Sequence, residues 1–268
     1  MVVLITGASG GLGKVLGKLL VNEGLTVYGT MRSAQGKDKD YAFPIISMEA
    51  TDDNSVQLCI DQIVEKEGSI DVVVNCVNQM FIGSVEETSV TEVENLYSTN
   101  VFGALRICKA VLPVMRKQGH GCIINMSSLG GLLAVPYMST YTSAKFALET
   151  ISEALYREVK DDNISVTIMQ PVAMKMDRAA SGSHLRLVDK VKKGSFSHKM
   201  LAGMAKDTAA SRLTPEMVAD KIYQVIQAKN KPLRVPMDKA KAVTILKRFA
   251  PLWLIDSLIK KLLNDMAK

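Results

Sequence analysis

The opening of the chain constrains the fold most strongly. Residues 2–5 are four consecutive apolar residues, three of them β-branched, which predicts a buried strand. A glycine-rich turn follows at residues 6–13, with the sequence TGASGGLG. Apolar residues then recur at helical spacing as far as Gly24, a suitable helix terminator. The succession of strand, glycine turn and helix predicts an α/β fold.

The glycine turn has the composition of a phosphate cradle. Glycines let the backbone approach a pyrophosphate closely, and the N-terminus of the following helix offers free N–H groups and a positive dipole end. We therefore interpret the turn as a dinucleotide site rather than as a turn whose glycines serve packing alone. Its candidate contacts are Gly7, Ser9, Gly10, Gly11, Leu12 and Gly13.

The end of the second predicted strand, residues 25–30, bears on the choice of dinucleotide. An acidic residue there would hydrogen-bond the ribose 2′-hydroxyl of NAD, whereas an arginine would accept the 2′-phosphate of NADP. Met31 and Arg32 stand at this place and no acid does. This pattern favours NADP(H) over NAD(H). The alternative is that Arg32 is an ordinary solvated surface residue.

A candidate catalytic pair lies in the middle of the chain. Tyr141 and Lys145 are four residues apart, so on a helix they share one face. A phenol titrates near pH 10, and a neighbouring ammonium would lower that pKa, which reversible proton transfer to a carbonyl requires. Ser128 lies thirteen positions upstream and is expected to hydrogen-bond the same carbonyl oxygen. Asn100 lies on a long helix predicted over residues 90–118.

In order and spacing these residues resemble the classical short-chain dehydrogenase/reductase family, most closely its hydroxysteroid and retinol dehydrogenase branch. The resemblance covers nearly the whole chain and is weakest over residues 177–211. It implies a Rossmann-like, doubly wound parallel sheet in a single domain over residues 1–268. It also implies hydride transfer between a nicotinamide and a carbonyl or alcohol carbon. The catalytic residues would be Asn100, Ser128, Tyr141 and Lys145.

The resemblance assigns a role to each catalytic residue. Tyr141 is the acid/base, and Lys145 lowers its pKa and holds the nicotinamide ribose. Ser128 orients the substrate oxygen. Asn100 distorts its helix and holds a water of the proton relay, or else is a plain helix-surface amide. The further cofactor contacts that the resemblance implies are Glu49, Ala50, Asn75, Cys76, Val77, Tyr141, Lys145, Pro171, Val172 and Met174.

Two segments depart from the family pattern. Residues 75–78 read Asn-Cys-Val-Asn where the family has Asn-Asn-Ala-Gly. After the sixth predicted strand, residues 165–170, Val172 and Met176 replace a glycine and a threonine. These changes support an alternative function, a dinucleotide-binding regulatory or scaffold protein with little turnover. The intact catalytic residues favour the enzyme.

The residues expected around the nicotinamide are apolar and adaptable, among them Val172, Met174, Met176, Met200 and Met204. No group of arginines stands near Ser128 and Tyr141 to hold an anion. We therefore expect a lipophilic carbonyl or alcohol substrate. Residues 177–211 are predicted to form a mobile substrate lid, the alternative being an ordered helical pair used in oligomer packing.

The tail, residues 238–268, is amphipathic and carries seven basic and three acidic residues, a net charge of +4. One interpretation is that it docks on the core or on a second subunit of a homo-dimer or homo-tetramer. The other is that it contacts a membrane surface or forms the mouth of a pocket for lipophilic substrates.

Composition bears on whether the protein binds nucleic acid, holds a metal or enters a membrane. The net charge of +6 is spread over the chain without a nucleic-acid-binding motif, so no nucleic acid partner is expected. The four cysteines lack metal-ligand spacing and are expected to be reduced thiols, with no metal site. No apolar run has the length of a membrane span, and no leader precedes the first strand. These features predict a cytoplasmic protein.

Overall fold

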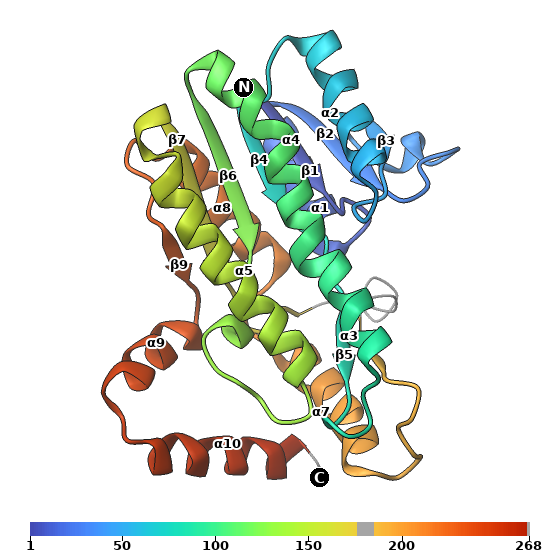
Figure 1. The fold of residues 1–268 in the computed structure, drawn as a ribbon, viewed down its shortest axis with the longest axis vertical. Coiled ribbons are helices and arrows are strands. Elements are labelled where there is room, and N and C mark those ends of the chain that lie inside the picture. The colour runs from blue at the N-terminus through green and yellow to red at the C-terminus, as the bar shows by residue number, and fades with distance from the viewer. Residues whose placement is uncertain (176–184, 267–268) are drawn as a thin grey trace.

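The computed structural model describes residues 1–175 and 185–266. Seven strands form one parallel sheet in the order β3-β2-β1-β4-β6-β7-β9 (Figure 1). They are β1 (Val2–Thr6), β2 (Thr26–Met31), β3 (Ile45–Ser47), β4 (Val72–Asn75), β6 (Gly121–Met126), β7 (Ile164–Gln170) and β9 (Arg234–Pro236). The doubly wound parallel sheet predicted from the sequence is confirmed, and the ends of the strands predicted at residues 2–5, 25–30 and 165–170 agree to within one residue.

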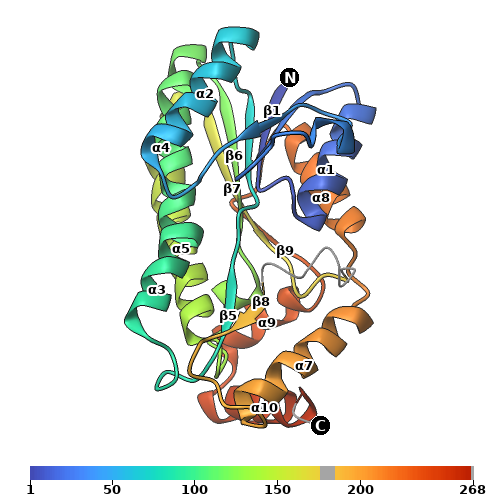
Figure 2. The same ribbon diagram turned by 90° about the vertical axis from the view of Figure 1, so that its right-hand side faces the viewer.

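Helices cover both faces of this sheet (Figure 2). One face packs against α1 (Gly11–Asn22) and α8 (Pro215–Gln227), and the other against α2 (Asp53–Glu67), α4 (Gly103–Gln118) and α5 (Ser139–Glu158). Because both faces are covered, the central strands are almost entirely apolar and buried. This explains why the strands read as continuous apolar runs rather than as alternating patterns.

The strand order reverses beside β1, which pairs with β2 on one side and β4 on the other. In a parallel sheet the connections on the two sides of such a point leave in opposite directions, which opens a crevice at the carboxyl ends of the strands. The glycine turn at residues 6–13 lies at this crevice, because it follows β1 directly. The topology thus places the candidate dinucleotide site at the usual ligand-binding edge.

The helix predicted over residues 90–118 is interrupted, so the prediction of one continuous helix is wrong. The structure has α3 (Val90–Tyr97), a π-helical turn at Ser98–Phe102 and then α4. A π turn contains one more residue per turn than an α-helix, so the apolar stripe continues across it. Asn100 lies within this turn, in agreement with the helix distortion that the family resemblance implied.

Two short strands escaped the sequence analysis. β5 (Met80–Ile82) pairs in parallel with β8 (Leu185–Leu187) and forms a separate two-stranded sheet. Each strand has only three residues, and about a hundred residues separate them in the chain. Neither therefore carries a pattern long enough to be recognised alone. Their pairing brings the segment after residue 184 against the segment that follows β4.

The remaining elements lie at the end of the molecule away from the N-terminus (Figure 1). They are α7 (Phe196–Ala210), α9 (Lys239–Phe249) and α10 (Leu252–Met266). The region expected to be a lid contains β8 and α7, while its residues 177–184 lie outside the described residues, as does Met176. None of the described helices is long and apolar enough to cross a membrane.

Candidate active site

A cavity of about 1420 Å³ occupies the carboxyl edge of the sheet. It runs from the glycine turn between β1 and α1, past the ends of β4, β6 and β7, to the C-terminal helices α9 and α10. Every residue of the predicted glycine-turn contact set lines it: Gly7, Ser9, Gly10, Gly11, Leu12 and Gly13. The structure therefore joins the candidate dinucleotide site and the candidate catalytic residues in one space.

The glycine turn leaves its backbone open to a ligand. Gly7 has a φ of +68°, and a Cβ on it would lie 3.0 Å from the Val77 backbone nitrogen. A Cβ on Gly13 would lie 2.7 Å from the Cα of Ala8. No side chain in the described part of the chain caps the start of α1 at Gly10, and its first turn contains no acid. The free N–H groups and dipole end therefore suit a pyrophosphate.

The other expected cofactor contacts line the same cavity with one exception. They are Met31, Arg32, Glu49, Ala50, Cys76, Val77, Pro171, Val172 and Met174. Met31 is buried and Arg32 is exposed at the end of β2. The Glu49 carboxylate accepts hydrogen bonds from the backbone N–H and hydroxyl of Thr51, at 3.1 and 2.9 Å. Arg32 therefore borders the cavity as an exposed side chain just after the end of β2.

Asn75 is the exception and does not line the cavity, so its assignment to the cofactor site stays a prediction. Its side chain is buried and donates to the Asn125 amide oxygen at 2.8 Å. Asn125 in turn donates to the Ser152 hydroxyl at 2.8 Å. Two adjacent strands and α5 are thereby joined by a buried polar chain. The role of Asn75 is to hold the sheet beneath the site.

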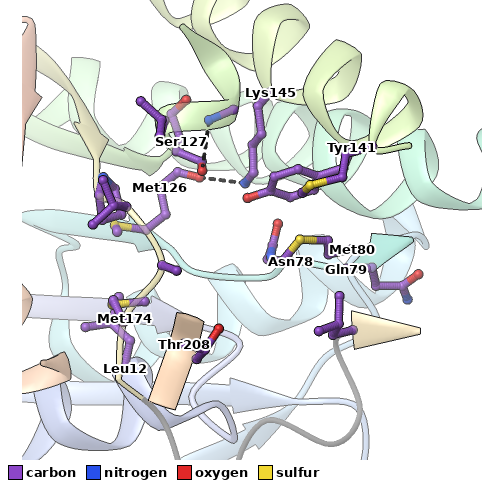
Figure 3. Close-up of a pocket in the computed structure, with 18 of the residues that line it drawn as sticks. Leu12, Asn78, Gln79, Met80, Met126, Ser127, Tyr141, Lys145, Met174 and Thr208 are labelled. Atoms are coloured by element: carbon purple, nitrogen blue, oxygen red, sulfur yellow. Dashed lines mark hydrogen bonds between the residues drawn. The ribbon is translucent and has the colours of Figure 1, made fainter. Parts of the chain in front are cut away.

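Tyr141, Ser128 and Lys145 all line the cavity. Figure 3 shows Tyr141 and Lys145 side by side at its wall. Tyr141 and Lys145 lie one turn apart on α5, and Ser128 follows the end of β6. The Lys145 Nζ donates to the Met126 carbonyl at 2.8 Å and lies 5.7 Å from the centre of the Tyr141 ring. Lys145 is buried, with its ammonium fixed at the end of β6. The helix-face prediction for this pair is confirmed.

The expected electrostatic effect of Lys145 on Tyr141 is corrected. Burial raises the pKa of the Tyr141 phenol, and a hydrogen bond with Ser128 only partly opposes this rise. Burial also lowers the pKa of Lys145 to about 8, while the nearby Cys76 and Glu149 act in the opposite direction. In this structure the cost of charging a group away from water is the largest contribution to both pKa shifts. Tyr141 is therefore a protonated phenol at neutral pH.

Asn100 acts on the site through the backbone of a neighbouring segment. Its amide oxygen accepts from the Gln79 N–H and its amide nitrogen donates to the Gln79 carbonyl, both at 2.7 Å. Its side chain is buried and does not line the cavity. The π turn thus fixes the position of the chain between β4 and β5, which forms one wall of the cavity.

Two groups of cavity-lining residues were missed in the sequence analysis. The first is the wall formed by Asn78, Gln79, Met80 and Phe81. The Oδ1 of Asn78 is buried without a hydrogen-bond partner in the described structure, and the unusual Asn in place of glycine was its only signal. The second group comes from the tail: Val243, Leu246, Ile255, Leu258, Ile259 and Leu262. The mouth of a pocket was one interpretation of the tail's amphipathic pattern, but the residues that line the cavity were not named.

Comparison with known proteins agrees with this geometry. A family model described as short chain dehydrogenase matches residues 1–184. The chain is 40% identical to a 3-ketodihydrosphingosine reductase of Bacteroides thetaiotaomicron over 173 residues, which covers 63% of this chain and 62% of that protein.

Two crystal structures extend the likeness to the rest of the fold. A short-chain dehydrogenase from Streptomyces avermitilis is 28% identical, with a TM-score of 0.80 over 98% of this chain and 94% of that one. The enzyme ElxO with NADP bound is 25% identical, with a TM-score of 0.71 over 88% of this chain and 95% of that one. The fold, the family model and the convergence of Ser128, Tyr141 and Lys145 therefore point to the same class of protein.

Proposed function

The chain belongs to the short-chain dehydrogenase family of oxidoreductases, and from this premise we propose that it transfers a hydride between NADP(H) and a lipophilic carbonyl or alcohol. The observation that carries the proposal is the convergence of Tyr141, Ser128 and Lys145 on a cavity whose other end is the glycine turn. A scaffold protein would have no need to keep a buried ammonium beside a buried phenol, because burying both groups costs stability.

Three features support NADP(H) as the cofactor. The glycine turn offers uncapped N–H groups for a pyrophosphate, and Arg32 offers a guanidinium for a 2′-phosphate. ElxO, a structural relative, is described with NADP bound. The nicotinamide supplies the hydride when it is bound, and the protein supplies binding, orientation and proton transfer. Lys145 and Tyr141 would hold the nicotinamide end, and residues 7–13 the pyrophosphate.

The proton chemistry follows from the state of Tyr141. Because burial raises the pKa of its phenol, Tyr141 holds its proton at neutral pH and donates it to a carbonyl oxygen in the reductive direction. Ser128 shares a hydrogen bond with this phenol and orients the same oxygen. Lys145, held by the Met126 carbonyl, places a positive charge beside the phenol and favours the phenolate that remains after transfer.

The substrate class follows from the far end of the cavity. Beyond Tyr141 the cavity is lined mainly by apolar residues from several elements: Met80, Phe81, Leu133, Val135, Met138, Leu185, Met204, Leu246, Ile255 and Ile259. Such walls select long apolar groups through the free energy of removing them from water. The relative named 3-ketodihydrosphingosine reductase carries in its name a ketone on a long alkyl chain, which agrees with this substrate class.

The test is Tyr141→Phe, assayed for NADPH-dependent reduction of a panel of long-chain ketones and aldehydes. Loss of the acid/base group should lower kcat by about 10²–10⁴-fold and leave NADPH affinity, measured by fluorescence titration, nearly unchanged. Tyr137→Phe is the matched control, because Tyr137 lies four residues earlier in the turn before α5, packs on Phe196 and does not line the cavity. A Tyr141→Phe variant within a few-fold of the parent contradicts the assignment. Stoichiometric NADPH binding without turnover by the parent favours the regulatory alternative.

A further inference from the structure

The junction between α9 and α10 carries an exposed apolar cluster. Ile245, Phe249, Leu252 and Trp253 are 64%, 75%, 72% and 70% exposed. Ile245 and Phe249 are four residues apart on α9 and therefore project from the same face of the helix. Most of the other large exposed apolar residues in the described structure, such as Leu58 and Val85, stand singly. Four within nine residues form a continuous patch, which marks an interaction surface.

Two basic side chains flank this cluster. Of the four basic residues in 239–253, Lys239 and Lys247 line the cavity, whereas Lys241 and Arg248 do not. Lys241 and Arg248 are exposed and lie one turn from Ile245, on the outward side of α9. The Arg248 guanidinium lies 5.5 Å from the centre of the Phe249 ring. The patch therefore combines apolar tips with positive charge.

The opposite faces of the same two helices form a wall of the active-site cavity. Val243 and Leu246 on α9 line it, as do Ile255 and Ile259 on α10, whereas the exposed residues of the cluster do not. Figure 1 shows the junction at the outer corner of the molecule, at the end opposite the N-terminus. One short stretch of chain thus presents an apolar, basic surface outward and the cavity wall inward.

We propose that the α9–α10 junction docks on the surface of a bilayer containing anionic lipids. Phe249, Leu252 and Trp253 would enter the boundary between headgroups and acyl chains, and Lys241 and Arg248 would lie against the lipid phosphates. Charge complementarity favours this occupant over a second copy of the chain. A two-fold interface would bring the basic residues of one copy against those of the other.

Docking in this orientation would place the part of the cavity that α9 and α10 line next to the lipid phase. Apolar substrates dissolved in the bilayer would then reach the site without crossing water. This consequence rests on the proposed function, but the docking itself does not. Both properties are measured on the same protein. Absence of vesicle binding would contradict the docking alone, and absence of turnover would contradict the proposed function alone.

The experiment uses the full chain and its single tryptophan, Trp253, as the reporter. Phosphatidylcholine vesicles with about one third phosphatidylglycerol should bind the protein in flotation and shift its tryptophan emission to the blue, and added salt should reverse this. Phe249→Asp, and separately Lys241→Glu combined with Arg248→Glu, should weaken binding about tenfold or more. Leu58→Asp is the matched control, since Leu58 is 68% exposed on α2.

Two results would overturn the proposal. One is equal binding to pure phosphatidylcholine and anionic vesicles by parent and variants alike, because neither charge nor the apolar cluster would then matter. The other is a dimer in light scattering that Phe249→Asp dissolves, with no vesicle binding by the parent. Circular dichroism and NADPH titration of each variant establish that the fold is retained.

Discussion

At the scale of single residues, the charge of Lys145 serves the proposed chemistry but lowers the stability of the fold, because the ammonium is buried. Its ammonium is buried and its pKa falls from 10.5 to about 8. Holding the charged form in the folded protein therefore costs about 3 kcal/mol at neutral pH. Its hydrogen bond to the Met126 carbonyl recovers about 1 kcal/mol. Lys145→Met should thus abolish activity and raise the free energy of unfolding by about 2 kcal/mol at pH 7.

The stability that Lys145→Met gains over the parent should disappear at high pH. Below the folded pKa of about 8, both states of the parent hold the proton and the folded state bears the full burial cost. Between about 8 and 10.5 only the unfolded state holds it, so the parent gains stability as pH rises. Denaturant titrations of the two proteins across this range measure the difference directly. A difference that is constant with pH would mean that the pKa of Lys145 is the same in the folded and unfolded states, so that burial does not shift it.

Arg32 is the residue on which the choice of dinucleotide depends. Arg32→Ala should weaken NADPH binding by roughly 10- to 100-fold and leave NADH binding nearly unchanged, because only NADPH carries the 2′-phosphate. Lys37→Ala, which removes an exposed cation a few residues further along, is the control. Equal losses for both cofactors, or a parent that prefers NADH, would show that Arg32 is a solvated bystander.

Single residues were predicted well where the evidence was local. The spacing of Tyr141 and Lys145 is a property of one helix, and the glycines belong to one turn, so both assignments follow from short stretches of chain. The direction of the Tyr141 pKa depends on burial by distant segments and was predicted wrongly. Asn75 was assigned to the cofactor site from the short sequence around it. That short sequence gives no sign that the buried Asn75 amide hydrogen-bonds Asn125.

At the scale of elements, the π turn over Ser98–Phe102 is held by Asn100. Asn100→Ala would leave the N–H and carbonyl of Gln79 without their partners at 2.7 Å. The free energy of unfolding should fall by about 2–3 kcal/mol, and the wall of the cavity should loosen. Thermal and denaturant unfolding measure this loss. Asn54→Ala, an exposed change near the start of α2, should stay within about 0.5 kcal/mol.

A loss below about 1 kcal/mol would mean that packing alone, and not the amide of Asn100, fixes the turn. The turn itself was hidden in the sequence because the apolar stripe runs on through it. The strands β5 and β8 were hidden for another reason, since each becomes a strand only through its partner. By contrast, α2 begins at a local signal, its N-cap Asp52, whose carboxylate accepts from the Ser55 N–H at 2.8 Å. A helix cap can be predicted from adjacent residues, whereas the pairing of two distant strands cannot.

At the scale of the whole molecule, the parallel sheet and its two helical layers follow from alternating strand and helix patterns. The order of these elements along the chain fixes the crevice at β1. The sequence did not predict how the C-terminal helices return to that crevice. Val243, Leu246, Ile255 and Ile259 close a cavity that begins more than 200 residues earlier in the chain. An amphipathic pattern specifies that a face is covered, but it carries no information on what covers it.

The dimensions of this cavity lead to a prediction about substrates. In a homologous series of straight-chain aldehydes or methyl ketones, each methylene that enters the apolar part contributes about 0.8 kcal/mol. The value of kcat/KM should therefore rise about fourfold per carbon and level off when the cavity is filled. Sugars should react poorly, because most of the residues that line this part of the cavity are apolar.

A variant at the far end of the cavity tests whether the apolar walls cause this trend. Ile259 lies half-buried on α10 and lines the cavity. Ile259→Asn should lower kcat/KM for the longest members of the series by about tenfold and leave the short members unchanged, because only long chains reach it. Leu58→Asn, far from the cavity, should leave the whole series unchanged. A series that is flat in the parent, or one that Ile259→Asn lowers equally at all lengths, would mean that the cavity does not select substrates by apolar length.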